Sequence, residues 1–189
     1  RLLAEERITD VHIVPTQLIS LLTLPDIGER ELPYLKRIWY AASPMPVEVL
    51  KQGLSVFGPI FLQGYGPTES GPDIAILSEA NHRYAETSPE AEGVLASCGQ
   101  PCIGVHVRIV DERDRDVEAG EIGEIIVKSK RNMIGYWRKP EETKEAIRDG
   151  WLYTGDLGYY DESGFVYIAD RKEDMIITGG ENVYPIEVE

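Results

Sequence analysis

The residues best suited to chemistry stand in one short string, which reads Gly-Tyr-Gly-Pro-Thr-Glu over residues 64–69. Two glycines let the backbone come close to a flat ring, and Tyr65 can stack on that ring. The hydroxyl of Thr68 can donate to a phosphate oxygen, and the carboxylate of Glu69 can hold Mg²⁺. Taken by itself, the string is explained equally well by a turn that needs glycine only for its backbone.

Two further strings could take part in the same chemistry. Asp156 follows a glycine at the end of the string 150–156, and its carboxylate could accept both hydroxyls of a ribose. Arg171 follows Asp170, and its guanidinium could contact ribose or phosphate. A glycine pair at 179–180 then allows a ligand or another segment to approach closely. For each string alone, an ordinary turn with solvated charges is the better interpretation.

The elements that must position the first string alternate between strand and helix. The pattern predicts a strand and a helix within 12–23, a strand over 36–42, a helix from Pro46 to residue 57, and a strand over 60–62. This order is typical of a parallel α/β layer. Ligands bind at the carboxyl ends of the strands in such layers, and the string 64–69 comes soon after the last of these strands.

The pattern changes near residue 80 and indicates a second, β-rich region. The polar segment 81–92 is predicted to be a surface loop, and alternating apolar residues predict a strand over 105–110. The later predicted elements are a charged turn over 111–116, a returning strand over 121–128, a helix over 140–148, a hairpin with strands at 151–153 and 164–168, and a strand, a glycine turn and a helix start beyond 172.

Composition argues against several classes of protein. The 189 residues include 19 basic and 33 acidic ones, which gives a net charge of −14. Such acidity argues against a nucleic-acid-binding protein that neutralises phosphates, although it leaves the binding of a single nucleotide open. No apolar run approaches the roughly 18 residues of a membrane span. Cys98 and Cys102 lack the spacing of a zinc or redox site, so we expect two small, partly buried thiols and a cytoplasmic protein.

Together the three strings resemble the acyl- and aryl-CoA synthetase branch of the adenylate-forming, AMP-binding enzymes. The resemblance runs through nearly the whole chain, because other matching strings stand in order around them. These are 14–16 (Val-Pro-Thr), 41–46 (Ala-Ala-Ser-Pro-Met-Pro), 99–101 (Gly-Gln-Pro), 135–137 (Gly-Tyr-Trp) and 181–187 (Glu-Asn-Val-Tyr-Pro-Ile-Glu). The last string resembles the CoA ligases more than the adenylation domains of peptide synthetases.

The resemblance implies a reaction in two halves that uses a carboxylic acid, ATP, Mg²⁺ and CoA. The carboxylate attacks the α-phosphate of ATP to give an acyl-AMP and pyrophosphate, and the thiol of CoA then attacks the acyl carbonyl to give a thioester. It implies catalytic roles for Thr68, Glu69 and Arg171, with Glu69 as the metal ligand. The residues that it places around the nucleotide or, for the last of them, along the path of CoA are Ser43, Pro44, Gly64, Tyr65, Gly66, Thr68, Asp156, Ile168, Arg171 and Gly180.

The implied fold has three parts within an α/β class. Residues 1–88 would be the end of a large α/β domain, residues 89–169 a distorted antiparallel β-barrel, and residues 170–189 a hinge and the start of a small α+β C-terminal domain. The family's lysine-containing phosphate loop and its C-terminal catalytic lysine are absent from the sequence. We therefore expect a fragment that works with the remainder of its own chain and is inactive alone.

Three functions are considered, in order of preference. The first is an acid–CoA ligase for a fatty or aromatic acid, and the second is an adenylation domain that loads a carrier protein. The third is a non-catalytic homologue that keeps the fold to bind a ligand. In the first two, we expect Tyr40, Ala41, Gly64 and residues 70–72 to wall part of the acid pocket, where small residues leave room for a bulky or long acid.

Overall fold

The computed structural model describes residues 2–172, 176–178 and 181–183. The chain divides into two compact units. The first unit comprises residues 1–65 and 76–99, and the second comprises residues 66–75 and 100–189. The predicted three-part division at residues 88 and 169 stays a prediction.

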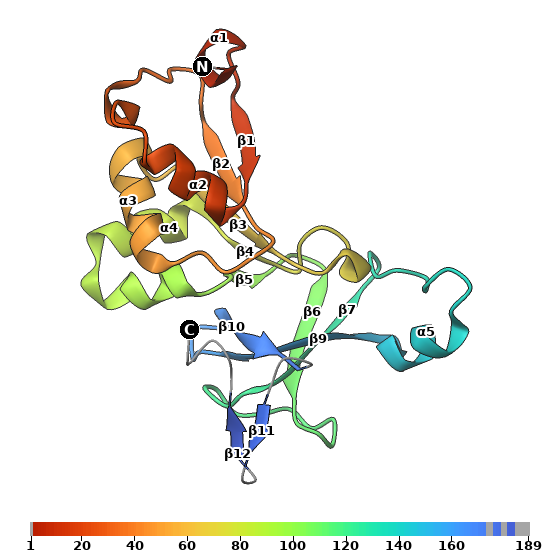
Figure 1. Ribbon diagram of the computed structural model, residues 1–189. Coiled ribbons are helices and arrows are strands. Elements are labelled where there is room, and N and C mark those ends of the chain that lie inside the picture. Colours follow the sequence, from red (N-terminus) through yellow and green to blue (C-terminus); the bar gives the residue numbers. More distant parts are fainter. Residues whose placement is uncertain (1, 173–175, 179–180, 184–189) are drawn as a thin grey trace. The chain divides into compact units, whose positions relative to one another are not determined.

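The first unit is built on parallel strands, as predicted. β1 (Asp10–Ile13), β2 (Arg37–Tyr40) and β3 (Phe61–Tyr65) pair in parallel, with Ile38 of β2 opposite both Val11 and Phe61. The helices between them, α2 (Pro15–Leu22) and α3 (Val47–Phe57), cross over from one strand to the next (Figure 1). Each helix follows a proline signal, since Pro15 opens α2 and Pro46 immediately precedes α3.

The core of the first unit lies between these helices and strands. Leu18 of α2, Leu50 of α3, and Ile38 and Phe61 of the sheet are almost fully buried. Burying each such side chain stabilises the fold by about 1.5–3 kcal/mol. A Cβ atom on Gly53 of α3 would come within 2.9 Å of the Phe61 ring, so glycine is what allows the helix to pack this close to β3.

The prediction of a surface loop over 81–92 is wrong. The segment instead contains the helix α4 (Glu79–Thr87), followed by the 3₁₀ helix η3 (Pro89–Ala96). Ser78 caps α4, because its hydroxyl accepts from the backbone of Asn81 at 3.2 Å and its own backbone donates to the Asn81 side chain at 3.0 Å. Only two residues of α4, His82 and Ala85, are buried, and so narrow an apolar stripe left the helix hidden in the polar sequence.

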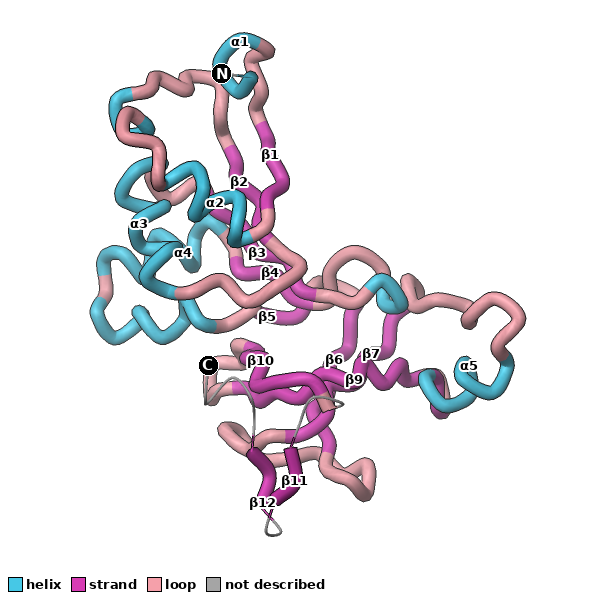
Figure 2. Tube along the Cα trace, in the orientation of Figure 1, coloured by secondary structure: helices cyan, strands magenta, loops and turns pink. Residues whose placement is uncertain are grey.

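The second unit carries an antiparallel sheet in the order β10-β9-β7-β6, visible in Figure 2. The predicted strands are confirmed, with β9 longer than expected because it runs on into the predicted Asp156 string. The elements of the second unit are η2 (Thr68–Ser70), β5 (Gln100–Pro101), β6 (Val105–Val110), β7 (Gly123–Ser129), α5 (Pro140–Ala146), β8 (Ile147–Arg148), β9 (Trp151–Tyr160), β10 (Val166–Arg171), β11 (Ile176–Thr178) and β12 (Glu181–Val183). The remaining elements of the chain are α1 (Leu2–Glu5), η1 (Ile27–Glu29) and β4 (Ala75–Leu77).

The described strands form an open sheet, not the barrel that was predicted. β8 adds to β9 beside the main path, and β6 and β10 are the two outer strands. Backbone from the charged turn folds back on β6, where Val110 bridges Asp116 and Val117 donates to Ile109 at 3.1 Å. Closing a sheet into a barrel requires its outer strands to pair, and here the turn takes up part of the β6 edge. The mixed α/β class is confirmed.

The end of the chain is described only in part. β11 and β12 pair antiparallel, with Thr178 opposite Glu181, and β11 confirms that a strand lies within 172–178. Gly180 and the predicted helix start at 185–189 lie outside the described residues.

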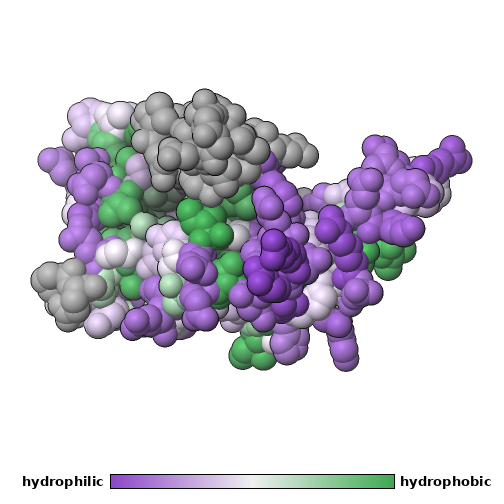
Figure 3. Space-filling model, turned by 90° about the horizontal axis from the view of Figure 1, so that it is seen from below, coloured by the Kyte–Doolittle hydropathy of each residue, from purple (hydrophilic) through white to green (hydrophobic). Residues whose placement is uncertain are grey.

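None of the helices among the described residues is both long and apolar enough to cross a bilayer. The face seen in Figure 3 is mostly hydrophilic, with hydrophobic side chains in separate small groups. Cys98 is buried and Cys102 is half-buried.

Candidate functional site

Several of the predicted strings meet at one cavity of about 170 Å³ within the second unit. Glu69 comes from the short helix η2, Arg171 from the end of β10, and residues 152–155 from β9. The residues that line the cavity are Pro67, Glu69, Tyr136, Leu152, Tyr153, Thr154, Gly155 and Arg171. Residues more than 100 positions apart in the sequence, such as Glu69 and Arg171, thus line the same cavity.

Glu69 is held through both its backbone and its side chain. Its carbonyl oxygen accepts a hydrogen bond from the backbone of Met133 at 2.6 Å. Its Oε1 accepts a hydrogen bond from the hydroxyl of Tyr136 at 2.9 Å. Two residues further on, Gly71 has a φ of +82° and a Cβ atom there would lie 3.1 Å from the Cβ of Arg131. The turn after Glu69 therefore needs glycine, both for its backbone angle and for this close approach.

Tyr136 is a lining residue to which the sequence gave no role. Its backbone donates to Oγ1 of Thr143 on α5 at 2.9 Å. The preceding Gly135 has a φ of +146°, and a Cβ atom there would lie 2.7 Å from Thr143 Cγ2, so no larger residue fits without movement. Partial burial, together with the neighbouring Glu69, raises the pKa of Tyr136 above its usual value. The phenol therefore keeps its proton at neutral pH and donates a hydrogen bond to the carboxylate. In the sequence, Tyr136 stood out only as a member of the matching string 135–137.

Asp156 and Arg171 face each other across β9 and β10, where they are register partners. Arg171 Nε lies 3.5 Å from Asp156 Oδ1, and the two side chains are 72% and 12% exposed. A carboxylate this buried needs compensating partners, since desolvating a charge is costly. Next to Asp156, Gly155 has a φ of +75°, and its carbonyl accepts from the Lys172 backbone at 2.8 Å.

The residues that line the cavity do not include the other described site residues predicted in the second unit, which are Gly66, Thr68, Asp156 and Ile168. The Thr68 side chain is exposed at the start of η2, and Ile168 is half-buried on β10 opposite Gly158. At Gly66, a Cβ atom would come within 3.1–3.2 Å of the turn formed by residues 70–74. The chain's own turn therefore occupies the space that Gly66 leaves open.

The predicted site residues of the first unit stand at the ends of two neighbouring parallel strands. Ser43 and Pro44 are exposed in the segment after β2, where Ala42 adopts a φ of +76°. Gly64 and Tyr65 form the last two residues of β3, the first buried and the second half-buried. The expectation that this string lies at the carboxyl end of a parallel strand is confirmed.

Two residues proposed for the acid pocket have other surroundings. Tyr40 is fully buried in the core, where its hydroxyl lies 2.9 Å from Nε2 of His82. His82 Nδ1 lies 2.8 Å from the backbone oxygen of Ser78, and burial lowers the pKa of His82 to about 4. Ser70 is also fully buried, and its hydroxyl donates to the Pro67 carbonyl of its own turn at 2.8 Å. Both side chains are occupied by structural contacts.

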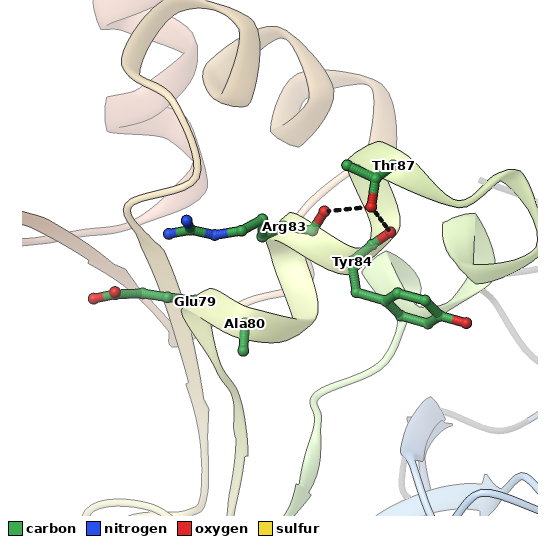
Figure 4. Close-up of a pocket in the computed structure, with 5 residues that line it drawn as sticks. All are labelled: Glu79, Ala80, Arg83, Tyr84 and Thr87. Atoms are coloured by element: carbon green, nitrogen blue, oxygen red, sulfur yellow. Dashed lines mark hydrogen bonds between the residues drawn. The ribbon is translucent and has the colours of Figure 1, made fainter.

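A second hollow, of about 460 Å³, lies over α4 in the first unit (Figure 4). All of its lining residues, from Glu79 to Thr87, come from that one helix. The Thr87 hydroxyl bonds back to the carbonyls of Arg83 and Tyr84 at 3.2 Å, and Glu79 is paired with Arg37. None of the predicted site residues lines this hollow.

The oxygen donors at the cavity determine whether Mg²⁺ fits there. Among the described residues, no three His, Cys, Asp or Glu side chains cluster in a way that would enclose a metal. Mg²⁺ at a nucleotide site usually keeps several waters and takes only one or two carboxylates besides the phosphates. Glu69 offers one such carboxylate, with one oxygen bonded to Tyr136, at the wall of a cavity. The donor set therefore fits Mg²⁺ brought in with a nucleotide.

Comparison with known proteins identifies the family of this chain. Residues 1–137 match the family model of the AMP-binding enzymes. The chain belongs to the AMP-binding enzyme family. The match spans the cavity residues Pro67, Glu69 and Tyr136.

The curated relatives of this family member include ligases of fatty acids. The chain is 42% identical over its whole length to the medium/long-chain-fatty-acid–CoA ligase FadD8 of Mycobacterium tuberculosis, of which it covers 32%. It is 36% identical, over 96% of its length, to the fatty acid–[acyl-carrier-protein] ligase ScoC of Streptomyces coeruleorubidus, of which it covers 34%. The chain thus spans about a third of the length of these relatives.

Solved structures of related enzymes share the fold of this chain. The amide bond synthetase McbA of Marinactinospora thermotolerans matches the whole chain with a TM-score of 0.90 at 33% identity, over 36% of its own length. The o-succinylbenzoate–CoA synthetase MenE of Bacillus subtilis, solved with ATP and a magnesium ion, matches 97% of the chain. Its TM-score is 0.82 at 34% identity, over 36% of its own length.

Proposed function

We propose that this AMP-binding family member supplies nucleotide and metal contacts to an ATP-dependent ligase that activates a fatty or aromatic acid and transfers it to CoA. The observation that carries the proposal is the cavity at which Glu69 and Arg171 meet. A half-buried carboxylate and an exposed guanidinium on one small cavity suit a ligand that carries both phosphates and a metal ion. The covered third of FadD8 and the likeness to MenE support the same choice.

Each residue takes a role that its chemistry allows. Arg171, which is 72% exposed, supplies a mobile positive charge for ribose or phosphate oxygens. Asp156 accepts hydrogen bonds from the ribose hydroxyls, and the Thr68 hydroxyl donates to the α-phosphate. Glu69 holds the magnesium ion. When bound, that ion reduces the repulsion between the phosphates and an attacking carboxylate.

The residues of the first unit supply the adenine contacts in this proposal. Tyr65 stacks on the base, while the backbone of Ser43 and Pro44 lies along its edge. Gly64 keeps a side chain away from that surface, and Gly66, in the second unit, leaves room for the turn 70–74. Ile168 flanks the nucleotide, and Gly180 lines the path of the CoA thiol. The reaction that results is an acid plus ATP giving acyl-AMP and pyrophosphate, followed by acyl-AMP plus CoA giving acyl-CoA and AMP.

A carrier-protein ligase is the second candidate, because ScoC is among the relatives. The first half-reaction is the same in both cases, and only the thiol that accepts the acyl group differs. The string 181–187 resembles the CoA ligases, and for this reason CoA is preferred. A full-length chain that transfers its acyl group to a carrier protein and not to CoA would reverse the order.

The nucleotide role is tested by replacing Asp156 with alanine in the full-length chain. Losing the ribose acceptor should reduce kcat/KM for ATP about 100-fold, which corresponds to about 2.7 kcal/mol. Pyrophosphate release with a series of acids of graded chain length measures this effect and also ranks the acids. Unchanged ATP dependence would return Asp156 to a purely structural role, and turnover of acetate alone would refute the fatty or aromatic acid.

The matched control is Asp111→Ala in the charged turn after β6. Asp111 is also an aspartate paired with an arginine, since its Oδ2 lies 2.6 Å from Arg115 Nη2. Its partner Arg115, unlike the partner Arg171 of Asp156, is not among the residues that line the cavity. We expect its loss to leave ATP use unchanged. The same assay on the 189-residue chain alone should give little or no pyrophosphate, since the family's catalytic lysine is absent from it.

A further inference from the structure

Tyr136 lines the cavity, and neither the family resemblance nor the proposed function gives it a role. Its hydroxyl donates to Glu69 Oε1 at 2.9 Å, and both side chains line the same cavity. The two residues lie 67 positions apart in the sequence, so the contact depends on the fold of the second unit. A phenol that engages one oxygen of a carboxylate fixes how that carboxylate is turned.

The position of Tyr136 is itself fixed by α5. Its backbone donates to Thr143 Oγ1 at 2.9 Å, and that hydroxyl donates to the carbonyl of Lys139 at 2.7 Å. Gly135 packs directly against Thr143, with only 2.7 Å between its ideal Cβ position and Thr143 Cγ2. The start of the Tyr136 side chain is therefore set by contacts that do not involve Glu69.

The same segment that carries Tyr136 also holds the backbone around Glu69. Met133 donates its backbone N–H to the Glu69 carbonyl at 2.6 Å. Arg131 donates from Nη2 to the Asp73 carbonyl at 2.6 Å. Residues 131–136 thus bind the turn 69–73 through its backbone and the Glu69 carboxylate through the phenol. This double attachment leaves the carboxylate little freedom to rotate.

We propose that Tyr136 is a positioning residue for Glu69, which it orients for a divalent cation. The phenol uses one lone pair of Oε1, and the carboxylate keeps its other lone pairs for the ion. Outer hydrogen bonds of this kind raise metal affinity by holding the ligand in one orientation before the ion arrives. The inference rests on the proposed function, because Glu69 is the metal ligand there.

The test is Tyr136→Phe in the full-length chain, with Mn²⁺ as a paramagnetic substitute for Mg²⁺. Free Mn²⁺ is measured by electron paramagnetic resonance in the presence of a non-hydrolysable ATP analogue. We expect the dissociation constant of Mn²⁺ to rise about tenfold. Binding of the same analogue without metal should stay unchanged, because the phenol acts only through the carboxylate.

The matched control is Tyr167→Phe. The hydroxyl of Tyr167 also donates to a carboxylate, that of Asp161 at 3.2 Å, but in the hairpin between β9 and β10. Its loss should leave Mn²⁺ binding within twofold of the wild type. Thr143→Val is a second, milder variant, which loosens the backbone of Tyr136 and should raise the constant two- to threefold. It replaces Tyr136→Phe as the test if that variant does not fold.

A double-mutant cycle separates this inference from the proposed function. Glu69→Gln should weaken Mn²⁺ binding by itself, and Tyr136→Phe should then have no further effect in the Glu69→Gln background. An unchanged constant for Tyr136→Phe, or an equal loss in both backgrounds, would overturn the positioning role while leaving Glu69 as a ligand. Unchanged binding in Glu69→Gln would overturn the metal role of Glu69, and the inference with it.

Discussion

The two units hold their site residues by different means. In the first unit, Ser43 and Pro44 are exposed after β2, and Tyr65 stands at the end of β3. In the second unit, Glu69 is bonded to Tyr136, and Asp156 is paired with Arg171. Backbone groups and an aromatic ring are positioned by the ends of the strands alone. A partly buried charge also needs hydrogen-bond or ion-pair partners. We therefore expect substitutions of buried residues in the first unit to lower its stability. Substitutions of the paired polar residues in the second unit should instead weaken ligand binding.

The largest effect is expected from Phe61→Ala in the first unit. Phe61 is fully buried, and its ring meets that of Tyr40 edge-on at 6.3 Å between centroids. Emptying this site should lower the free energy of unfolding by about 3–5 kcal/mol. Denaturant unfolding measures the loss, and Phe57→Ala, at a half-buried position on α3, should cost clearly less. Equal losses at both positions would mean that β3 does not anchor this core.

The second effect is a dependence of stability on pH through His82. The folded-state pKa of about 4 lies below the ordinary value of 6.5, because the ring is buried. The unfolded chain therefore takes up this proton first, and stability falls as pH decreases from about 6.5 toward 4, by roughly 2–4 kcal/mol in all. The measurement is the unfolding free energy of wild type and His82→Gln at pH 7 and pH 4.5.

The expected result is a clearly smaller loss in His82→Gln than in the wild type over this pH range. Other acidic groups titrate in both proteins, so only the difference between the two curves reports on His82. Parallel curves would show that the ring already accepts a proton in the folded state. In that case the first unit would also accommodate a buried charge, and the two units would not differ in this respect.

The smallest effect is expected from Arg171→Met in the second unit. The side chain is largely exposed, so the unfolding free energy should change by less than about 1 kcal/mol. Loss of its charge should raise KM for ATP about tenfold, or about 1.4 kcal/mol. Arg115→Met removes an equally exposed arginine paired with Asp111 and should leave KM unchanged. A large loss of stability in Arg171→Met would indicate that this pair supports the sheet and not the ligand.

Sequence patterns predicted most of the elements in both units. Leucines at helical spacing predicted α2, and prolines at their starts helped to predict α3 and α5. Alternation of apolar residues predicted β6. The helix α4 was missed because only His82 and Ala85 are buried on it. Its cap, formed by Ser78 and Asn81, was a readable signal. The barrel was predicted from the family resemblance, and the described strands stay open because local sequence does not determine how sheet edges pair.

The candidate site was predicted unevenly. Glu69 and Arg171 were identified from their strings, and the fold brings both to one cavity. The role of Tyr136 could not be read from its neighbours, because its partner lies 67 residues away. Tyr40 was expected near the acid, but its hydroxyl meets His82, which belongs to a helix that the sequence pattern did not reveal. Long-range hydrogen bonds are the common cause of these differences.

The order of the amino acids sets the chemical groups of this protein and most of its local structure. Glycine, proline and apolar spacing act within a few residues, so they set turns, helix starts and strands before any tertiary contact forms. Which of these side chains form hydrogen bonds or ion pairs with one another depends on the tertiary structure. Whether a carboxylate such as Glu69 is oriented by Tyr136, or one such as Asp156 is paired with Arg171, depends on contacts between distant segments, and these exist only once the sheet of the second unit has formed.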